Sequence, residues 1–267
     1  MGEPKKLVLQ ASEVSIVFGR LRAVSGFNCE LYENELVGLI GPNGAGKTTM
    51  FNMLSGIYTP TEGLITFWDK KGKPRNINKM NPAELNKIGV ARTFQNIRLF
   101  NQLSVSDNVR IALHSSRQSN CLDALFRTAR FRRDEKRMTA CVNQLLELFH
   151  IADKKDELAK NLPYGEQRKL EIVRALASNP KLLLLDEPAA GMNPQETDEL
   201  MNLISFIRKE FNLTILLIEH DMKLVMGICE RLMVLDYGRV IASGNPDEIK
   251  ANPQVIKAYL GSEAVNA

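Results

Sequence analysis

A glycine-rich segment between two apolar stretches is the feature that most constrains the fold of this 267-residue chain. The segment fits the pattern G-x-x-x-x-G-K-[ST]; it follows an apolar stretch at 36–40 that predicts a strand and precedes a helical pattern at 47–54. Glycines let the backbone turn tightly, and N–H groups at a helix start bind anions. The segment therefore predicts a phosphate-binding loop. Its residues, with the threonine that follows the pattern, are Gly41, Pro42, Asn43, Gly44, Ala45, Gly46, Lys47, Thr48 and Thr49.

Side chains that suit phosphate chemistry lie in this loop and after a second apolar strand. We expect Lys47 to place a point charge on nucleotide phosphates and Thr48 to bind Mg²⁺. The apolar residues 182–185 end in Asp186 and Glu187. Strands buried on both faces are typical of parallel sheets, which bind ligands at their carboxyl ends. We therefore expect Asp186 to hold Mg²⁺ and Glu187 to polarise the water that attacks the γ-phosphate. A capping pair at a strand end is the alternative.

The pattern of apolar residues divides the chain into three parts. Strands are predicted at 7–18, 24–32, 36–40, 64–67 and 88–93, with a loop at 70–81. The stretch 95–162 is helical, with helices at 104–114 and 132–149. Helices and strands then alternate, which predicts a parallel sheet with right-handed crossovers. The elements of this last part are helix 165–178, strand 181–186, helix 195–209, strand 213–218, helix 221–229, strands 232–235 and 240–242, and short helices at 246–250 and 253–260.

Composition excludes several other classes of protein. Apolar residues make up 44% and charged residues 25%, which is ordinary for a globular protein and excludes disordered, collagenous and disulfide-framework chains. No apolar run approaches the about 18 residues of a spanning helix, and we expect no secretory signal. The four cysteines, Cys29, Cys121, Cys141 and Cys229, lie far apart, which favours reduced thiols without metal. The net charge of +4 is mild, and charge alone does not decide between a nucleic-acid partner and an anionic membrane surface.

Together with further motifs, these segments resemble an ABC-family ATPase. Residues 162–167 resemble the family's signature motif, and 190–193 occupy the place of its D-loop. Gln95, His220 and Phe18 match the Q-loop glutamine, the H-loop histidine and the aromatic that stacks on adenine. The resemblance implies an α/β fold: a P-loop NTPase (RecA-like) core with an N-terminal antiparallel β subdomain and an inserted α-helical subdomain. We expect one nucleotide-binding domain, 1–267, with 1–94 and 165–267 as the core and 95–164 as the helical subdomain.

The resemblance also implies a set of site residues and two cofactors, ATP and Mg²⁺. Lys47, Glu187 and His220 are the expected catalytic residues. Thr48, Gln95 and Asp186 are the expected Mg²⁺ ligands. For Phe18, a place in the core is the alternative to stacking on a purine, and for His220 it is a structural role. The expected nucleotide-binding residues are Phe18, Gly41, Pro42, Asn43, Gly44, Ala45, Gly46, Lys47, Thr48, Thr49, Gln95, Pro163, Gly165 and Glu166.

Three longer runs resemble one subfamily, the larger ATP-binding subunit of branched-chain amino acid importers. They lie at 91–95, 187–191 and 217–226. The resemblance implies two transmembrane permease subunits, a second ATP-binding subunit that is a sibling or a second copy, and indirectly an extracytoplasmic solute-binding protein. It implies no nucleic-acid partner. The chain is then expected at the cytoplasmic face of the inner (plasma) membrane, as a peripheral subunit. The alternative is a non-transport ABC ATPase that acts on nucleic acid or ribosomes, which the short helical region without sustained heptads disfavours.

The chain departs from the family pattern at the signature and the D-loop. The family's signature usually opens Leu-Ser-Gly-Gly-Gln, and here Pro163, Tyr164 and Glu166 replace its serine, first glycine and glutamine. Proline suits a helix start, but the lost hydroxyl predicts a nucleotide clamp weaker by about one hydrogen bond, roughly 0.5–1.5 kcal/mol. Asn193 stands where an aspartate is common. A basic cluster at 127–137 is expected to be a solvated helix face, with contact to a membrane partner or lipid as the alternative.

Overall fold

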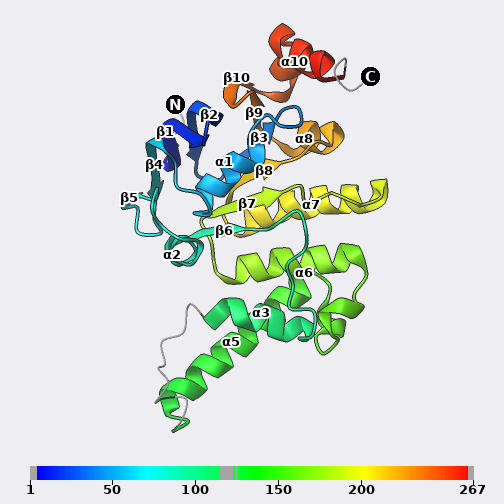
Figure 1. Ribbon diagram of the computed structural model, residues 1–267. Helices are drawn as coiled ribbons and strands as arrows, with labels where there is room; N and C mark the ends of the chain where they lie inside the picture. The colour runs from blue at the N-terminus through cyan, green and yellow to red at the C-terminus, as the bar shows by residue number, and fades with distance from the viewer. Residues whose placement is uncertain (1–4, 115–122, 124–125, 264–267) are drawn as a thin grey trace. The chain divides into compact units, whose positions relative to one another are not determined.

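The computed structural model describes residues 5–114, 123 and 126–263, which form two compact units (Figure 1). The first unit comprises 1–95 and 181–267, and the second comprises 96–180. The second unit therefore ends at residue 180, beyond the boundary at 165 expected from the sequence. The reason is that helix α6 (Tyr164–Ala177), which begins within the signature motif, packs on α3 (Val105–Leu113) and α5 (Ala129–Leu148).

The first unit contains a four-stranded antiparallel sheet in the order β2-β1-β4-β5. β1 pairs with β2 from Leu7↔Tyr32 to Phe18↔Leu21, and β4 pairs with the other edge of β1. This is the antiparallel β subdomain expected from the sequence, although β2 and β4 begin earlier than predicted. The strands are β1 (Leu7–Phe18), β2 (Leu21–Tyr32), β4 (Glu62–Trp68) and β5 (Pro74–Asn76).

Residues 70–92 differ from the sequence prediction in two places. The expected loop at 70–81 contains β5, which pairs with β4. The expected strand at 88–93 is preceded by a short helix, α2 (Pro82–Ile88), so that β6 (Val90–Arg92) is only three residues long. Asn81 caps α2 and forms a capping box with Glu84. These capping signals are present in the sequence, but a seven-residue helix has too few apolar positions for its period to be recognised.

A second sheet of six strands has the order β10-β9-β3-β8-β7-β6. The pairs from β9 to β6 are parallel, and β10 pairs antiparallel with β9 at the edge. Every residue of β3, β7 and β8 is buried, which confirms the parallel sheet predicted from their continuous apolar sequences. The remaining strands are β3 (Leu36–Ile40), β7 (Leu182–Asp186), β8 (Thr214–Ile218), β9 (Arg231–Asp236) and β10 (Arg239–Gly244).

Helix α1 (Lys47–Leu54) lies between the two sheets of the first unit (Figure 1). Its residues Met50, Phe51 and Leu54 are 0% exposed and join one apolar core with side chains of both sheets. Burying large apolar side chains contributes roughly 1.5–3 kcal/mol each. The packing therefore fixes the start of α1, and with it the glycine-rich loop, against the end of β3.

Side-chain caps begin α7, α8 and α9 of the first unit. Asn193 caps α7 and forms a capping box with Glu196, so the residue that replaces the family's D-loop aspartate has a structural role. Such a cap contributes about 1 kcal/mol. Asn245 caps α9 in the same way, and Asp221 caps α8. These helices are α7 (Pro194–Glu210), α8 (Met222–Ile228), α9 (Pro246–Ala251) and α10 (Pro253–Glu263).

The second unit is helical, as the sequence predicted. α3 and α5 both contact α6, and the interior includes Val109, Leu146 and Ile172, all 0% exposed. The basic cluster lies around the start of α5, with its cationic side chains exposed to solvent. No helix in the described ranges is both long and apolar enough to span a membrane. The elements are α3 (Val105–Leu113), α5 (Ala129–Leu148), α6 and two short turns at Ala152–Lys154 and Ala159–Asn161.

Candidate active site

The glycine-rich loop leaves β3 and leads into α1 through a backbone that glycine alone allows. Gly41 has φ 150°, and a Cβ at this position would lie 2.0 Å from the carbonyl oxygen of Leu235. Gly46 is the N-cap of α1 with φ 102°, and no side chain caps it. The N–H groups of the first helical turn are therefore offered to an anion, as the phosphate-loop prediction requires.

Lys47 lies inside the loop. Its side chain is 8% exposed, and its Nζ donates hydrogen bonds to the carbonyl oxygens of Gly41, at 2.6 Å, and Pro42, at 2.9 Å. Burial lowers the pKa of Lys47, and the charge of Glu187 opposes this shift. A buried cation held by neutral carbonyls gains most from an anion that enters the loop. The arrangement can therefore bind phosphate.

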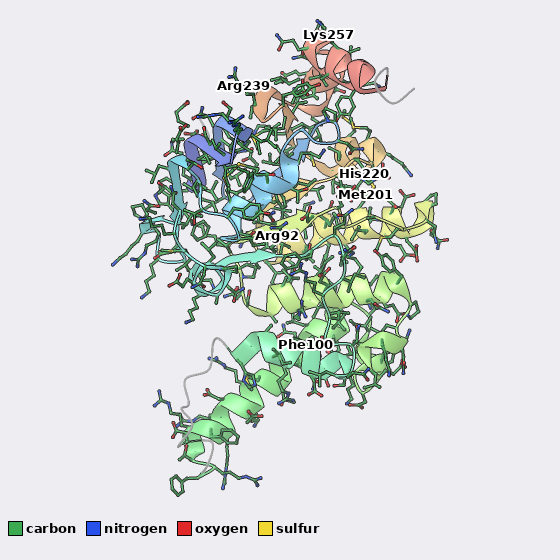
Figure 2. The ribbon with its side chains drawn as sticks, viewed as in Figure 1. Arg92, Phe100, Met201, His220, Arg239 and Lys257 are labelled. Atoms are coloured by element: carbon green, nitrogen blue, oxygen red, sulfur yellow. The ribbon has the colours of Figure 1, made fainter. Side chains whose placement is uncertain are left out.

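Asp186 is paired with an arginine that the sequence analysis missed. Arg92 Nη2 lies 2.6 Å from Asp186 Oδ2, and the two side chains are 6% and 7% exposed. Arg92 Nη1 also donates to Asn52 Oδ1, at 2.8 Å, and to Ser55 Oγ, at 2.7 Å, on and just after α1. Figure 2 shows Arg92 beside β6 and β7. The guanidinium thus joins the end of β7 to the helix that follows the phosphate loop.

Three residues expected at the site meet at the carboxyl ends of β6, β7 and β8. Gln95 Nε2 donates to Glu187 Oε2 at 2.7 Å, and His220 Nδ1 lies 3.7 Å from the same oxygen. Glu187 has φ 44°, in the left-handed region, while its N–H donates to the carbonyl oxygen of Ile218 at 2.9 Å. His220 is 67% exposed and lies near α7 and α8 (Figure 2). A carboxylate between an amide and an imidazole can orient and activate a water molecule.

Glu219, between Ile218 and His220, is a second residue that the sequence analysis missed. Its side chain is 1% exposed and accepts hydrogen bonds from the main chain of two loops. The signal was available, because Glu219 follows the apolar residues 215–218 in the same way as Asp186 follows the apolar residues 182–185. The rule that selected Asp186 and Glu187 therefore also selects Glu219.

Phe18 ends β1 and is 43% exposed, so it is not a core residue. Its ring lies 5.2 Å from that of Tyr58, centroid to centroid, with 71° between the planes. An edge-to-face pair of this kind holds one aromatic ring in place against the other. Of the two sequence-based expectations for Phe18, burial in the core is therefore wrong.

The residues expected to hold Mg²⁺ supply oxygen atoms, which are the ligands that this ion prefers. Thr48 is exposed in the first turn of α1, Asp186 ends β7, and Gln95 contacts Glu187 as described. Among the described residues there is no group of three or more His, Cys, Asp or Glu side chains that could hold a metal ion. This donor set fits Mg²⁺, which proteins bind through one or two side chains together with substrate phosphates.

Pro163, Gly165 and Glu166 belong to the second unit, at the start of α6. Pro163 is the N-cap with φ −55°, and the N–H groups of Glu166 and Gln167 donate to its carbonyl oxygen. The helix therefore starts as predicted despite the missing serine. Lys154 Nζ lies 2.5 Å from Glu166 Oε1, so the side chain that replaces the family's glutamine is engaged in an ion pair.

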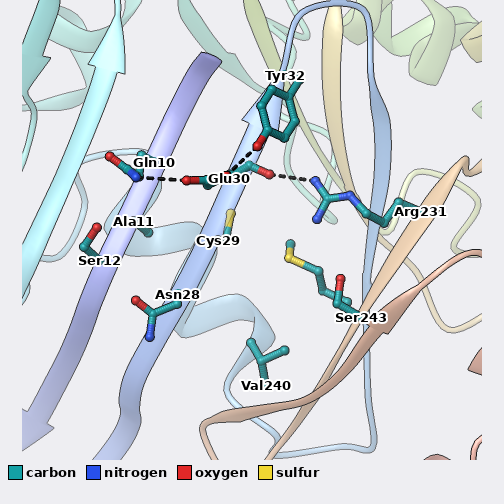
Figure 3. Close-up of a pocket in the computed structure, with 11 residues that line it drawn as sticks. Gln10, Ala11, Ser12, Asn28, Cys29, Glu30, Tyr32, Arg231, Val240 and Ser243 are labelled. Atoms are coloured by element: carbon teal, nitrogen blue, oxygen red, sulfur yellow. Dashed lines mark hydrogen bonds between the residues drawn. The ribbon is translucent and has the colours of Figure 1, made fainter. Parts of the chain in front are cut away.

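A separate cavity of about 470 Å³ lies between β1 and β2 on one side and β9 and β10 on the other (Figure 3). Its polar groups bind one another: the Glu30 carboxylate accepts from Gln10 and Tyr32, and the Glu30 carbonyl oxygen accepts from Arg231. Burial raises the pKa of the Cys29 thiol in its wall to about 12. In the register of β9 with β3, Arg231 lies opposite Val37, near the start of β3. The phosphate loop follows the other end of β3, so the Arg231 end of the cavity lies away from that loop.

Comparisons with known proteins agree with this geometry. A family model described as ABC transporter matches residues 24–190, and one described as branched-chain amino acid ATP-binding cassette transporter matches 239–265. The chain is 45% identical over 254 residues to the high-affinity branched-chain amino acid transport ATP-binding protein BraF of Pseudomonas aeruginosa, covering 95% of this chain and 98% of that protein. It is 44% identical, with the same coverage, to LivG of Escherichia coli strain K12, which has the same description.

Solved structures of ATP-binding cassettes have the same fold. The ADP conformation of MJ1267, an ATP-binding cassette of an ABC transporter, is 28% identical, with a TM-score of 0.81 and coverage of 96% of this chain and 99% of that one. A nucleotide-free cassette from an ABC transporter has a TM-score of 0.78. The chain therefore belongs to the ABC transporter family and is one of its ATP-binding, ATP-hydrolysing subunits.

Proposed function

We propose that this chain is the ATP-hydrolysing motor subunit of an importer of branched-chain amino acids. The observation that carries the proposal is the 45% identity to BraF across almost the whole of both chains. The match of residues 239–265 to a family model named for branched-chain amino acid cassettes supports it independently of the ATPase motifs. Because the motor subunit does not contact the solute, the solute class rests on these relatives.

In this proposal the phosphate loop and Phe18 bind ATP. The loop N–H groups and the Lys47 ammonium hold the β- and γ-phosphates. Phe18 stacks on adenine, and its ring packs edge-to-face against Tyr58. The two carbonyl contacts of Lys47 keep the ammonium within the loop. Thr48, Asp186 and Gln95 would hold Mg²⁺, which neutralises phosphate charge when it is bound.

Glu187 is the proposed general base for the attacking water. Gln95 and His220 flank its carboxylate, at 2.7 Å and 3.7 Å, so both can hydrogen-bond a water or phosphate oxygen beside it. A positioned base of this kind contributes about 10²–10⁴-fold to the rate. The left-handed backbone of Glu187 supports a functional role, because this conformation costs of order 1–3 kcal/mol in a residue other than glycine.

Two ATP-binding subunits then act as a pair. Each ATP is bound between the phosphate loop of one subunit and the signature residues Pro163, Gly165 and Glu166 of the other. ATP binds the closed pair more tightly than the open subunits, and it therefore shifts the population towards closure. Hydrolysis reopens the pair. The second subunit is a sibling or a second copy of this chain.

The motor acts on two transmembrane permease subunits at the cytoplasmic face of the inner (plasma) membrane. Closure moves the helical unit together with the segment around Gln95, where a permease helix docks. An extracytoplasmic solute-binding protein delivers the amino acid to the permease. Support for these partners comes from relatives that are described as transport ATP-binding proteins.

Affinity purification of a Glu187→Gln variant tests the proposal. The tagged variant is purified from detergent-solubilised native membranes in ATP and Mg²⁺, with Lys47→Ala as the control that lacks ATP binding. We expect two very hydrophobic proteins and a second ATPase to co-purify with the variant. The same assembly, reconstituted with the wild-type chain, should carry out ATP-dependent uptake of leucine, isoleucine and valine. Recovery from the soluble fraction alone, or with nucleic acid or ribosomes, would contradict an importer; uptake of other solutes alone would contradict the solute class.

A further inference from the structure

Glu219 is a buried carboxylate to which the proposed mechanism assigns no role. It follows the buried strand β8 directly, and its side chain is 1% exposed. A carboxylate removed from water needs hydrogen-bond donors to offset its lost hydration. Within the described ranges its donors are three main-chain N–H groups from two different loops. Burial raises the pKa of Glu219, and these hydrogen bonds oppose the shift.

The two oxygens of Glu219 contact different loops. Oε1 accepts a hydrogen bond from the N–H of Ala189 at 2.8 Å, in the loop that follows β7. Oε2 accepts from the N–H groups of His220, at 3.1 Å, and Asp221, at 3.5 Å, in the loop that follows β8. One side chain therefore joins the loop that begins at Glu187 to the loop that carries His220.

This junction lies next to the pair of side chains proposed for hydrolysis. The N–H of Glu187, at the start of the first loop, donates to the carbonyl oxygen of Ile218, the last residue of β8, at 2.9 Å. Glu187 Oε2 and His220 Nδ1 are 3.7 Å apart, and Glu219 Oε2 lies 3.8 Å from the same nitrogen. Beyond the pairing of β7 with β8, Glu219 therefore adds a side-chain link between the two loops close to both side chains.

We propose that Glu219 is a positioning residue for ATP hydrolysis, which holds the loop of Glu187 against the loop of His220. Through Ala189 it also links His220 to the segment 189–193, so that a displacement of that segment on subunit pairing is transmitted to the histidine. The inference rests on the proposed roles of Glu187 and His220. Only a side chain with two acceptor oxygens and the length of glutamate makes both contacts.

Variants at Glu219 in the full-length chain test this role. Glu219→Ala removes both contacts, and we expect kcat for ATP hydrolysis to fall about 10²-fold, the effect of a roughly 1 Å misplacement of a reacting group. Glu219→Gln keeps one acceptor oxygen and is expected to have an intermediate kcat. Because neither variant changes the phosphate loop, KM and the Kd for a fluorescent ATP analogue should stay close to those of the wild type.

Glu35→Gln is the matched control. Glu35 is also a buried glutamate, 5% exposed. It binds Arg231 just before the start of β3, at the opposite edge of the sheet from the carboxyl ends where Glu187 and His220 lie. We expect this variant to lower Tm and to leave kcat unchanged when both are measured well below Tm. Equal losses of kcat in the Glu35 and Glu219 variants at comparable Tm would indicate a purely structural role and overturn the inference.

A double-mutant cycle with Glu187→Gln separates this inference from the proposed function. If Glu219 acts through Glu187 and His220, its substitution lowers kcat by a far smaller factor in the Glu187→Gln background than in the wild type. Full turnover in Glu187→Gln alone would overturn the proposed base. An inactive Glu187→Gln together with a fully active Glu219→Ala would overturn the positioning role alone.

Discussion

Replacing Arg92 by methionine should destabilise the first unit by several kcal/mol. The guanidinium lies 2.6 Å from Asp186 with both side chains nearly inaccessible to solvent, and it makes two further hydrogen bonds to Asn52 and Ser55. Methionine keeps much of the length and packing but leaves the Asp186 carboxylate buried without its cation. Removal of one partner of a buried pair costs about 3–5 kcal/mol. We therefore expect a loss of about this size in the free energy of unfolding.

Urea unfolding followed by the fluorescence of Trp68 measures this loss. Trp68 is the one tryptophan of the chain and lies on β4, so its signal reports on the first unit. Lys223→Met is the matched control, because Lys223 pairs with Asp198 at 2.8 Å while the two side chains are 66% and 53% exposed. An exposed pair contributes roughly 0–1 kcal/mol to stability, so the urea midpoint of the control should lie close to that of the wild type.

A double variant isolates the charge interaction. Adding Asp186→Leu to Arg92→Met removes the orphaned carboxylate, and we expect a coupling free energy of about 0.5–3 kcal/mol. The free energy of unfolding of Arg92→Met could instead lie within about 1 kcal/mol of the wild-type value, as expected for an exposed pair. That result would refute the claim that burial makes this ion pair essential.

The remaining predictions concern the nucleotide. Lys47→Ala should abolish ATP binding, measured with a fluorescent analogue, and retained tight binding would refute the phosphate-loop assignment. Gly41→Ala should weaken ATP binding at least tenfold, because its Cβ would lie 2.0 Å from the Leu235 carbonyl oxygen. A Cβ at Gly44 has no atom within 4 Å, so Gly44→Ala should bind ATP more tightly than Gly41→Ala. Equal affinities in the two variants would exclude the close approach as the cause. Pro163→Ser should restore about one hydrogen bond, roughly 0.5–1.5 kcal/mol, to the closed pair, and unchanged affinity and turnover would refute this.

The parts of the fold that the sequence predicted correctly are those with strong local signals. Continuous apolar runs identified β3, β7 and β8, and the rule that ligands bind at the carboxyl ends of parallel strands grouped Glu187 with His220. The helix α2 was missed because its signal lies in its cap. The boundary at 165 was misplaced because the packing of α6 depends on helices far from it in sequence.

The residues that the sequence analysis missed act through non-local contacts. Arg92 and Asp186 are 94 positions apart, and nothing in the local pattern around Arg92 indicates a buried ion pair. Glu219 contacts Ala189 across 30 positions, and its effect on the site appears only when both loops are in place. Burial of a charged side chain depends on which elements pack over it, which a single sequence does not specify.

The most direct test of the account is the rate of ATP hydrolysis by Glu187→Gln, measured together with ATP binding and subunit association. Because the amide cannot accept the proton of the attacking water, we expect kcat to fall by about 10²–10⁴-fold. ATP should remain bound, and size-exclusion chromatography in ATP should show an accumulated dimer. Wild-type turnover in this variant would contradict the assignment of Glu187, and with it the mechanism proposed for this motor subunit.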